Sequence, residues 1–238
     1  MGAWIVAALV AAAATYCWHR WQQLARAEFI RSYTFPHGLF DKLRTRRPQL
    51  DAKQMQLVAR GLRQFFLAYL HGGRRNVSMP SQVADDLWHE FILYTRQYDA
   101  FCRRAFGGFL HHTPAIALSR AGRKDQHNAG LRRVWWHTCK DENINPRAAT
   151  RLPLLFALDA KLGIADGFVY TPDCKSHRSQ EGAAEASGGV VYCGGDFSDG
   201  SFDGSTEGFG DSSFGDAGAD GGSGCGGDGG CGGGCGGD

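Results

Sequence analysis

The chain has 238 residues and a formal net charge of +2, which is enough length for one domain or two small ones. Its glycines are unevenly placed, because 23 of the 34 lie in residues 175–238. Glycine brings no side chain to bury, so this stretch cannot build a packed core, and we expect residues 1–174 to hold the folded part.

An uncharged apolar run, AWIVAALVAAAATYCW, lies at the start of the chain. It is short for a bilayer span, for which about 20 apolar residues are usual. Trp4 and Trp18 flank it as interfacial aromatics do, and Arg20 opens a basic stretch. Because the start lacks a basic residue and a good cleavage site, we expect an uncleaved single-pass anchor, with the domain and tail in the cytoplasm. The alternative is a helix buried in the domain or against a partner.

The middle of the chain predicts an irregular, mainly α-helical domain over residues 33–174, behind a hydrophobic helix over residues 1–32. Asp51 and Ser81 are typical N-cap residues, and each precedes a run with apolar side chains at helical spacing. We expect four helices in this domain, over residues 52–71, 82–106, 127–143 and 152–162. Strand signals are weak and are confined to residues 168–170 and 190–192.

The expected helix over residues 82–106 and the segment after it have the most informative pattern, VADDLWHEFILYTRQYDAFCRRAFGGFLHHTP. Trp88, Tyr98 and Cys102 share one stripe, which is typical of core side chains. Asp85 and His89 lie one helical turn apart on another face, where a carboxylate can orient an imidazole or both can bind a metal.

A pair of glycines then lets the chain turn back before His111 and His112. Neighbouring side chains of an extended segment point in opposite directions, so one of these histidines can approach His89 while the other faces water. Zinc is the metal that we expect, because the nitrogen of histidine and the sulfur of cysteine suit it. The predicted ligands are His89, His111, His112 and Asp85, with Cys102, Cys139, Cys174 and Cys193 as further candidates. Cys102 and Cys139 are otherwise explained as core residues.

The same string resembles the core motif of the glycine-rich domain-containing protein family. The resemblance includes an acid followed by Trp-His, then Tyr-x-x-Phe-Cys, then His-His-x-Pro, and it extends over about residues 40–195. It implies a helical domain followed by a glycine-rich tail, and it implies no established enzymatic activity.

The tail and the body have opposite charges. Residues 175–238 contain Lys175 and Arg178 against eleven acids, a net charge of −9. Residues 1–174 contain 24 basic against 13 acidic side chains, a net charge of +11. We therefore expect a disordered acidic tail that can contact the basic body. Three cysteines end the tail, Cys225, Cys231 and Cys235.

Three functions are consistent with these features. The favoured hypothesis is a membrane-anchored, non-enzymatic interaction domain with a protein partner and a structural metal, because no HExxH, GxSxG, paired CxxC or phosphate-loop motif is present. The second is a zinc enzyme that uses the histidine cluster, with Asp85, Asp86 or Glu90 as base. The third is nucleic-acid binding by the basic body, which is less favoured because that charge also suits a solvated face or contact with anionic lipid.

Overall fold

The computed structural model describes residues 2–112, 124–172 and 191–193. This part of the chain is mainly helical, as predicted. Its helices are α1 (Gly2–Ser32), α2 (Leu39–Arg46), α3 (Ala52–His71), α4 (Gln82–Leu93), α5 (Thr95–Phe106), α7 (Lys124–Asp141) and α8 (Leu154–Leu162), and its strands are β1 (Val169–Thr171) and β2 (Val191–Cys193). The strands pair in parallel, with Tyr170 opposite Tyr192.

Of the predicted tail, residues 175–238, the structure describes only residues 191–193. Val191–Cys193 lies in the segment that we expected to be disordered, but it forms β2, where the sequence has a weak strand signal at residues 190–192. The remaining tail predictions, residues 175–190 and 194–238 with Cys225, Cys231 and Cys235, lie outside the described residues, as does Cys174.

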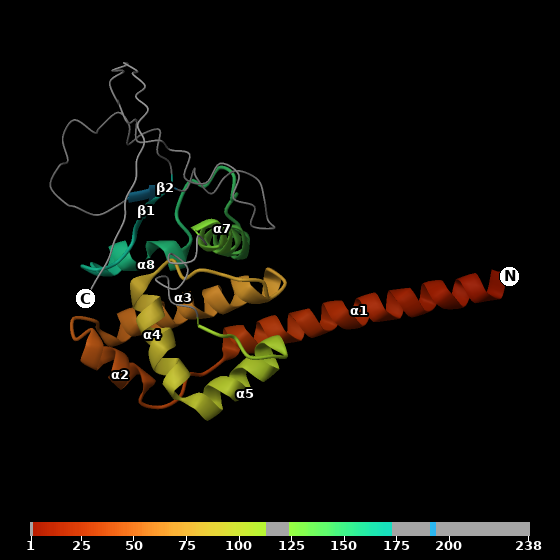
Figure 1. Ribbon diagram of the computed structural model, residues 1–238, viewed down its shortest axis with the longest axis horizontal. Helices are drawn as coiled ribbons and strands as arrows, with labels where there is room; N and C mark the ends of the chain where they lie inside the picture. The colour runs from red at the N-terminus through yellow and green to blue at the C-terminus, as the bar shows by residue number, and fades with distance from the viewer. Residues whose placement is uncertain (1, 113–123, 173–190, 194–238) are drawn as a thin grey trace, which may run out of the picture.

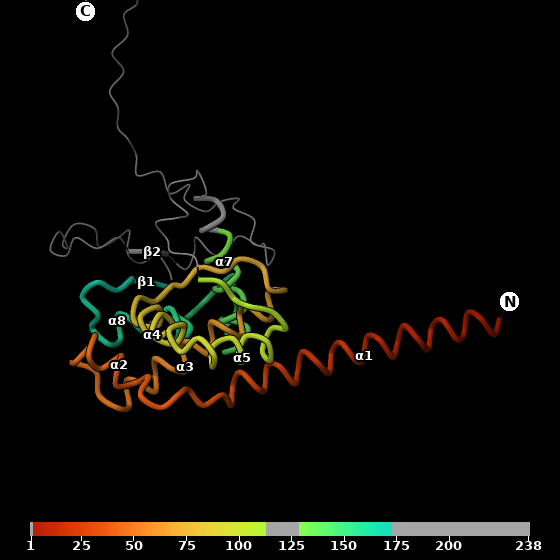
Figure 2. Tube along the Cα trace, turned by 60° about the horizontal axis from the view of Figure 1, so that its bottom comes forward, coloured from red at the N-terminus to blue at the C-terminus, as the bar shows by residue number. Residues whose placement is uncertain are grey.

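The long helix α1 leaves the body and extends away from it (Figures 1 and 2). Only Ala27 and Ile30, near its C-terminal end, are buried. Trp4 at the other end is 82% exposed, so the alternative of an apolar run packed into the domain is wrong. By length and composition α1 can cross a membrane, and a signal sequence would have the same properties.

The centre of the body is α3, which packs against α1, α4, α7 and α8. Its predicted bounds are confirmed, because Asp51 and Gln54 form a capping box at its start. Phe65 and Phe66 are fully buried at its core. At Gly61 the helix is close to α8, since an added Cβ would lie 2.3 Å from Cδ1 of Leu158.

Two sequence predictions about the helices before residue 107 are wrong. The single helix expected over residues 82–106 is divided at Tyr94, whose φ of −81° and ψ of 59° are not helical. The Tyr94 hydroxyl donates to the His37 carbonyl at 3.3 Å, a tertiary contact with no local signal. The helix α2 was not predicted at all, although Leu39 and Leu43 are buried one turn apart.

Candidate metal centre

The site is built on α4, whose first turn is held by a carboxylate from a distant part of the chain. Asp159 of α8 is buried and accepts hydrogen bonds from the Ser81 hydroxyl at 2.7 Å and from the backbone N–H of Gln82 at 2.7 Å. It also accepts from the N–H groups of Val83 at 3.2 Å and Phe168 at 2.9 Å. These bonds satisfy donors that a helix start leaves unpaired, and they fix the direction in which α4 presents its next two carboxylates.

Asp85 is the first of these carboxylates, and it faces two histidines. Its Oδ1 lies 2.9 Å from Nε2 of His112, and its Oδ2 lies 3.3 Å from Nδ1 of His89. The two imidazole rings have centroids 4.2 Å apart. One ligand atom from each of the three residues lies within 4.8 Å of the others, so the group has the composition and spacing to hold a metal ion.

The position of His112 depends on a hydrogen-bonded pair inside the core. Trp88 Nε1 donates to the Tyr98 hydroxyl at 3.1 Å, and that hydroxyl donates to the Leu110 carbonyl at 2.6 Å. The backbone at residue 110 is therefore fixed two residues before His112. The Trp88 ring then packs edge-on against the His112 ring, with centroids 4.6 Å apart. Sequence reasoning placed Trp88 and Tyr98 in the core but missed that they support the site.

Of the two adjacent histidines, the structure brings only His112 to the group. His111 is exposed, and its ring lies beside that of Phe109 with centroids 4.8 Å apart. The turn that returns the chain is made at Gly107, which has a φ of +76°. The alternation of side chains along the extended segment therefore separates the two imidazoles.

His89 is oriented by its own helix. Its Nδ1 lies 2.9 Å from the Asp85 backbone carbonyl oxygen. When Nδ1 carries the proton and donates it there, the lone pair of Nε2 is left for a ligand, an arrangement common among metal-binding histidines. The side chain of His89 is 42% exposed, against 14% for His112, so the group opens to solvent on the His89 side.

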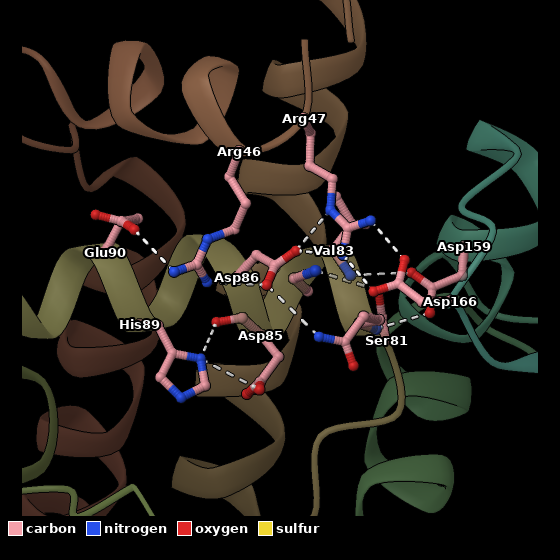
Figure 3. Close-up of polar contacts among 12 residues, drawn as sticks. Arg46, Arg47, Ser81, Val83, Asp85, Asp86, His89, Glu90, Asp159 and Asp166 are labelled. Atoms are coloured by element: carbon pink, nitrogen blue, oxygen red, sulfur yellow. Dashed lines mark hydrogen bonds and ion pairs between the residues drawn. The ribbon is translucent and has the colours of Figure 1, made fainter. Parts of the chain in front are cut away.

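Asp86, the next residue of α4, has a different environment (Figure 3). It accepts from Arg46 at 3.1 Å and from Nε of Arg47 at 2.8 Å, and Arg47 also binds Asp166. The hydrogen bond from Arg47 holds the pKa of Asp166 below its usual range, and burial opposes this shift. Glu90 lies 3.4 Å from Arg46. Both acids that were candidate bases beside Asp85 are thus ion-paired with arginines. The sequence around Asp86 and Glu90 does not indicate these arginines, which lie about 40 residues earlier in the chain.

The cysteine candidates do not extend the group in the part of the chain that the structure describes. Cys102 is buried, and burial raises the pKa of its thiol. Burial likewise raises the pKa of Cys139 to about 12. A thiol must lose its proton to bind zinc, so both environments favour the core interpretation. Of Cys193 only the backbone position in β2 is described.

The set of one carboxylate and two imidazoles suits divalent transition metals. Tetrahedral ligands about 2.0 Å from zinc lie roughly 3.3 Å from one another. The separation between Asp85 Oδ1 and His112 Nε2, 2.9 Å, is already near that value. Three protein ligands leave at least one coordination position open.

Comparison with known proteins places the chain in a family. The model of the UCP032817-like family matches residues 25–197, and the chain belongs to this uncharacterised family. The resemblance to the glycine-rich domain-containing protein family is therefore corrected, because the family match does not support it. Neither the curated proteins nor the solved structures give a match.

Proposed function

We propose that this protein is a membrane-anchored, non-enzymatic domain that binds a divalent transition metal ion through Asp85, His89 and His112, with zinc as the first metal to test. The observation that supports the proposal is the meeting of these three side chains. Asp85 and His89 come from α4, and His112 comes from the segment after α5. The hydrogen bonds that fix residue 110 support a built site rather than a chance encounter of surface side chains.

The ligand count favours an exchangeable metal over a closed structural one. A closed zinc site uses four protein ligands, whereas three residues form this group in the described part of the chain. The partly exposed side chain of His89 leaves this side of the group accessible to solvent. We propose that a side chain or terminus of a protein partner fills the open position.

An enzymatic role for the metal is less well supported. A hydrolase of this type needs a base beside the metal-bound water. Asp86 and Glu90 are the neighbouring acids, and both are held by Arg46. We therefore propose binding rather than hydrolysis.

The membrane half of the proposal rests on α1. The helix continues without a break from Gly2 to Ser32, so the apolar run passes directly into buried Ala27 and Ile30. Its basic residues, beginning with Arg20, follow the apolar run, which favours an uncleaved anchor with the domain in the cytoplasm. Carbonate extraction of membranes tests this part, and release into the soluble fraction would overturn it.

Metal content of the full-length protein in lipid nanodiscs tests the site. After equilibration with zinc and removal of free metal, elemental analysis should give about one zinc per chain for the natural protein. His112→Ala and His89→Ala should each weaken binding on the order of 100-fold or more, since each removes one of three ligands. His111→Ala is the matched control, and it should bind zinc as the natural protein does. Equal binding by the His112 and His111 variants would overturn the site.

A further inference from the structure

Three segments that are far apart in the sequence meet where α1 joins the body. The Phe106 carbonyl, at the end of α5, accepts hydrogen bonds from Arg26 of α1 at 3.3 Å and from Arg74, which follows α3, at 2.7 Å. The Arg104 guanidinium lies 4.4 Å from the centroid of the Phe29 ring on α1. Both views show the ends of α3 and α5 near the root of the projecting helix (Figures 1 and 2).

Six arginines, two from each segment, lie in the stretches that meet here, with Arg20 about 9 Å before Arg26 along α1. We name this group the arginine collar, and it consists of Arg20, Arg26, Arg74, Arg75, Arg103 and Arg104.

Few acids oppose the collar. In the same turns they are Glu28 and Asp99, and Asp99 accepts a hydrogen bond from Arg103 at 2.9 Å. Arg75 and Arg104 are exposed. With Arg31 of α1 and its partner Asp141 included, seven positive charges stand against three negative ones, which leaves a surface that complements an anionic one.

The helix fixes how far the collar lies from a bilayer. The rings of Trp18 and Trp21 pack together with centroids 5.4 Å apart, at the end of the apolar run where interfacial aromatics are expected. Arg26 follows Trp18 by eight residues, about 12 Å along a helix. A headgroup layer is roughly 5–8 Å thick. Because α1 is continuous and has no flexible linker, the collar stays near the outer edge of the headgroups, within about one Debye length.

We propose that the arginine collar docks on the anionic phospholipid headgroups of the leaflet from which α1 emerges, and so holds the ends of α3 and α5 against the membrane. This inference rests on the membrane anchor of the proposed function and is independent of the metal site. Nucleic acid also carries phosphate, but a collar around a membrane helix faces the bilayer, where lipid phosphates are already present at that depth.

Amide hydrogen exchange of the full chain in nanodiscs tests the docking. The discs contain either phosphatidylcholine alone or a 7:3 mixture of phosphatidylcholine and phosphatidylglycerol. We expect residues 72–76 and 103–108 to exchange at least roughly fivefold more slowly on the anionic discs, since each arginine near an anionic leaflet favours the docked state about fivefold. Half-molar salt should remove the difference.

Substitutions separate charge from folding. The variant Arg75→Gln/Arg103→Gln/Arg104→Gln should lose the slowing, and the corresponding lysine variant should retain it. The matched control, Lys42→Gln/Arg44→Gln/Lys53→Gln, neutralises exposed charges on α2 and at the start of α3, at the end of the body opposite to α1 (Figure 1). It should behave as the natural protein does.

Other outcomes would overturn the docking. Equal exchange on both kinds of disc would do so, as would slowing by an oligonucleotide on neutral discs with none on anionic discs. Exchange that is slow on both discs and rises only when residues 198–238 are deleted would show that the acidic tail covers the collar instead. Failure of the anchor would be seen separately, as protein that does not remain with either disc.

Discussion

Two neighbouring carboxylates on α4 have opposite surroundings. Asp86 meets guanidinium groups from Arg46 and Arg47, which remain positively charged at any ordinary pH. Asp85 meets the imidazoles of His89 and His112, which can be neutral and can offer lone pairs. A turn of about 100° between successive residues of a helix thus separates an ion-paired structural cluster from a group with the composition of a metal site. The difference teaches that the partners of a carboxylate, more than its burial, decide what it can do.

The largest expected effect is a loss of folding stability when Asp86 is replaced. Its side chain is 6% exposed, and Asp86→Ala leaves Arg47 without one of its two carboxylate partners. Loss of one partner of a buried ion pair costs about 3–5 kcal/mol, and we expect a value near the lower end because Arg46 is half exposed. Asp85→Ala should cost less than about 1 kcal/mol in metal-free protein. Denaturant unfolding of both variants measures the contrast, and equal losses would contradict it.

A histidine outside the site should set the pH dependence of folding. Burial, with smaller contributions from His71 and Arg133, lowers the pKa of His137 to about 4. Between pH 6.5 and 4 the unfolded chain therefore binds a proton that the folded chain does not, and stability falls as the pH falls through this window. The loss from this group is at most about 3 kcal/mol, and its contribution is fully present above pH 6.5.

Thermal unfolding of metal-free protein at pH 7 and at pH 5 measures this dependence. His137→Gln should reduce the drop between the two pH values, while His111→Ala should leave it unchanged. If the drop is the same in both variants, His137 does not titrate as its burial implies.

Tyr98 should connect the core with the site. Tyr98→Phe removes the hydroxyl that joins Trp88 to the Leu110 carbonyl. The Trp88 indole N–H and the Leu110 carbonyl oxygen each lose that hydrogen-bond partner. We expect a loss of about 1–3 kcal/mol in stability and a zinc affinity lower by roughly tenfold, because His112 is no longer held in place. Tyr94→Phe, which loses a surface hydrogen bond, is the control, and isothermal titration with zinc gives the affinities. Unchanged zinc affinity in Tyr98→Phe would show that the hydrogen bond does not position His112.

The smallest expected effect is at His111. Its exposed ring packs beside Phe109 and is not one of the three grouped residues, so His111→Ala should change stability by less than about 0.5 kcal/mol. The same titration and unfolding measurements check this variant. A marked loss of zinc affinity would show that the two histidines exchange roles.

The parts of this fold that the sequence predicts are those with local causes. Asp51 caps α3 through Gln54 three residues later, and its bounds follow from that short pattern. The Asp85 and His89 pair was likewise visible as one helical turn. The division at Tyr94 was not visible in the sequence, and the contact that the Tyr94 hydroxyl makes there is with the His37 carbonyl, 57 residues away.

The choice between His111 and His112 shows the same limit. Alternation of side chains requires that the two imidazoles separate, but it does not say which of them returns to α4. That choice depends on Tyr98, whose hydrogen bond to Leu110 fixes the register of the returning segment. The partners of Asp86 are equally non-local, and α2, which presents Arg46, had been missed as a helix.

X-ray absorption spectroscopy of the zinc-loaded full-length protein tests the central claim most directly, because it reports the atoms bound to the metal. Binding by Asp85, His89 and His112 predicts a first shell of nitrogen and oxygen at about 2.0–2.1 Å, with outer-shell scattering from two imidazoles and no sulfur. Scattering from sulfur at about 2.3 Å would instead place the metal on the cysteines and contradict the site.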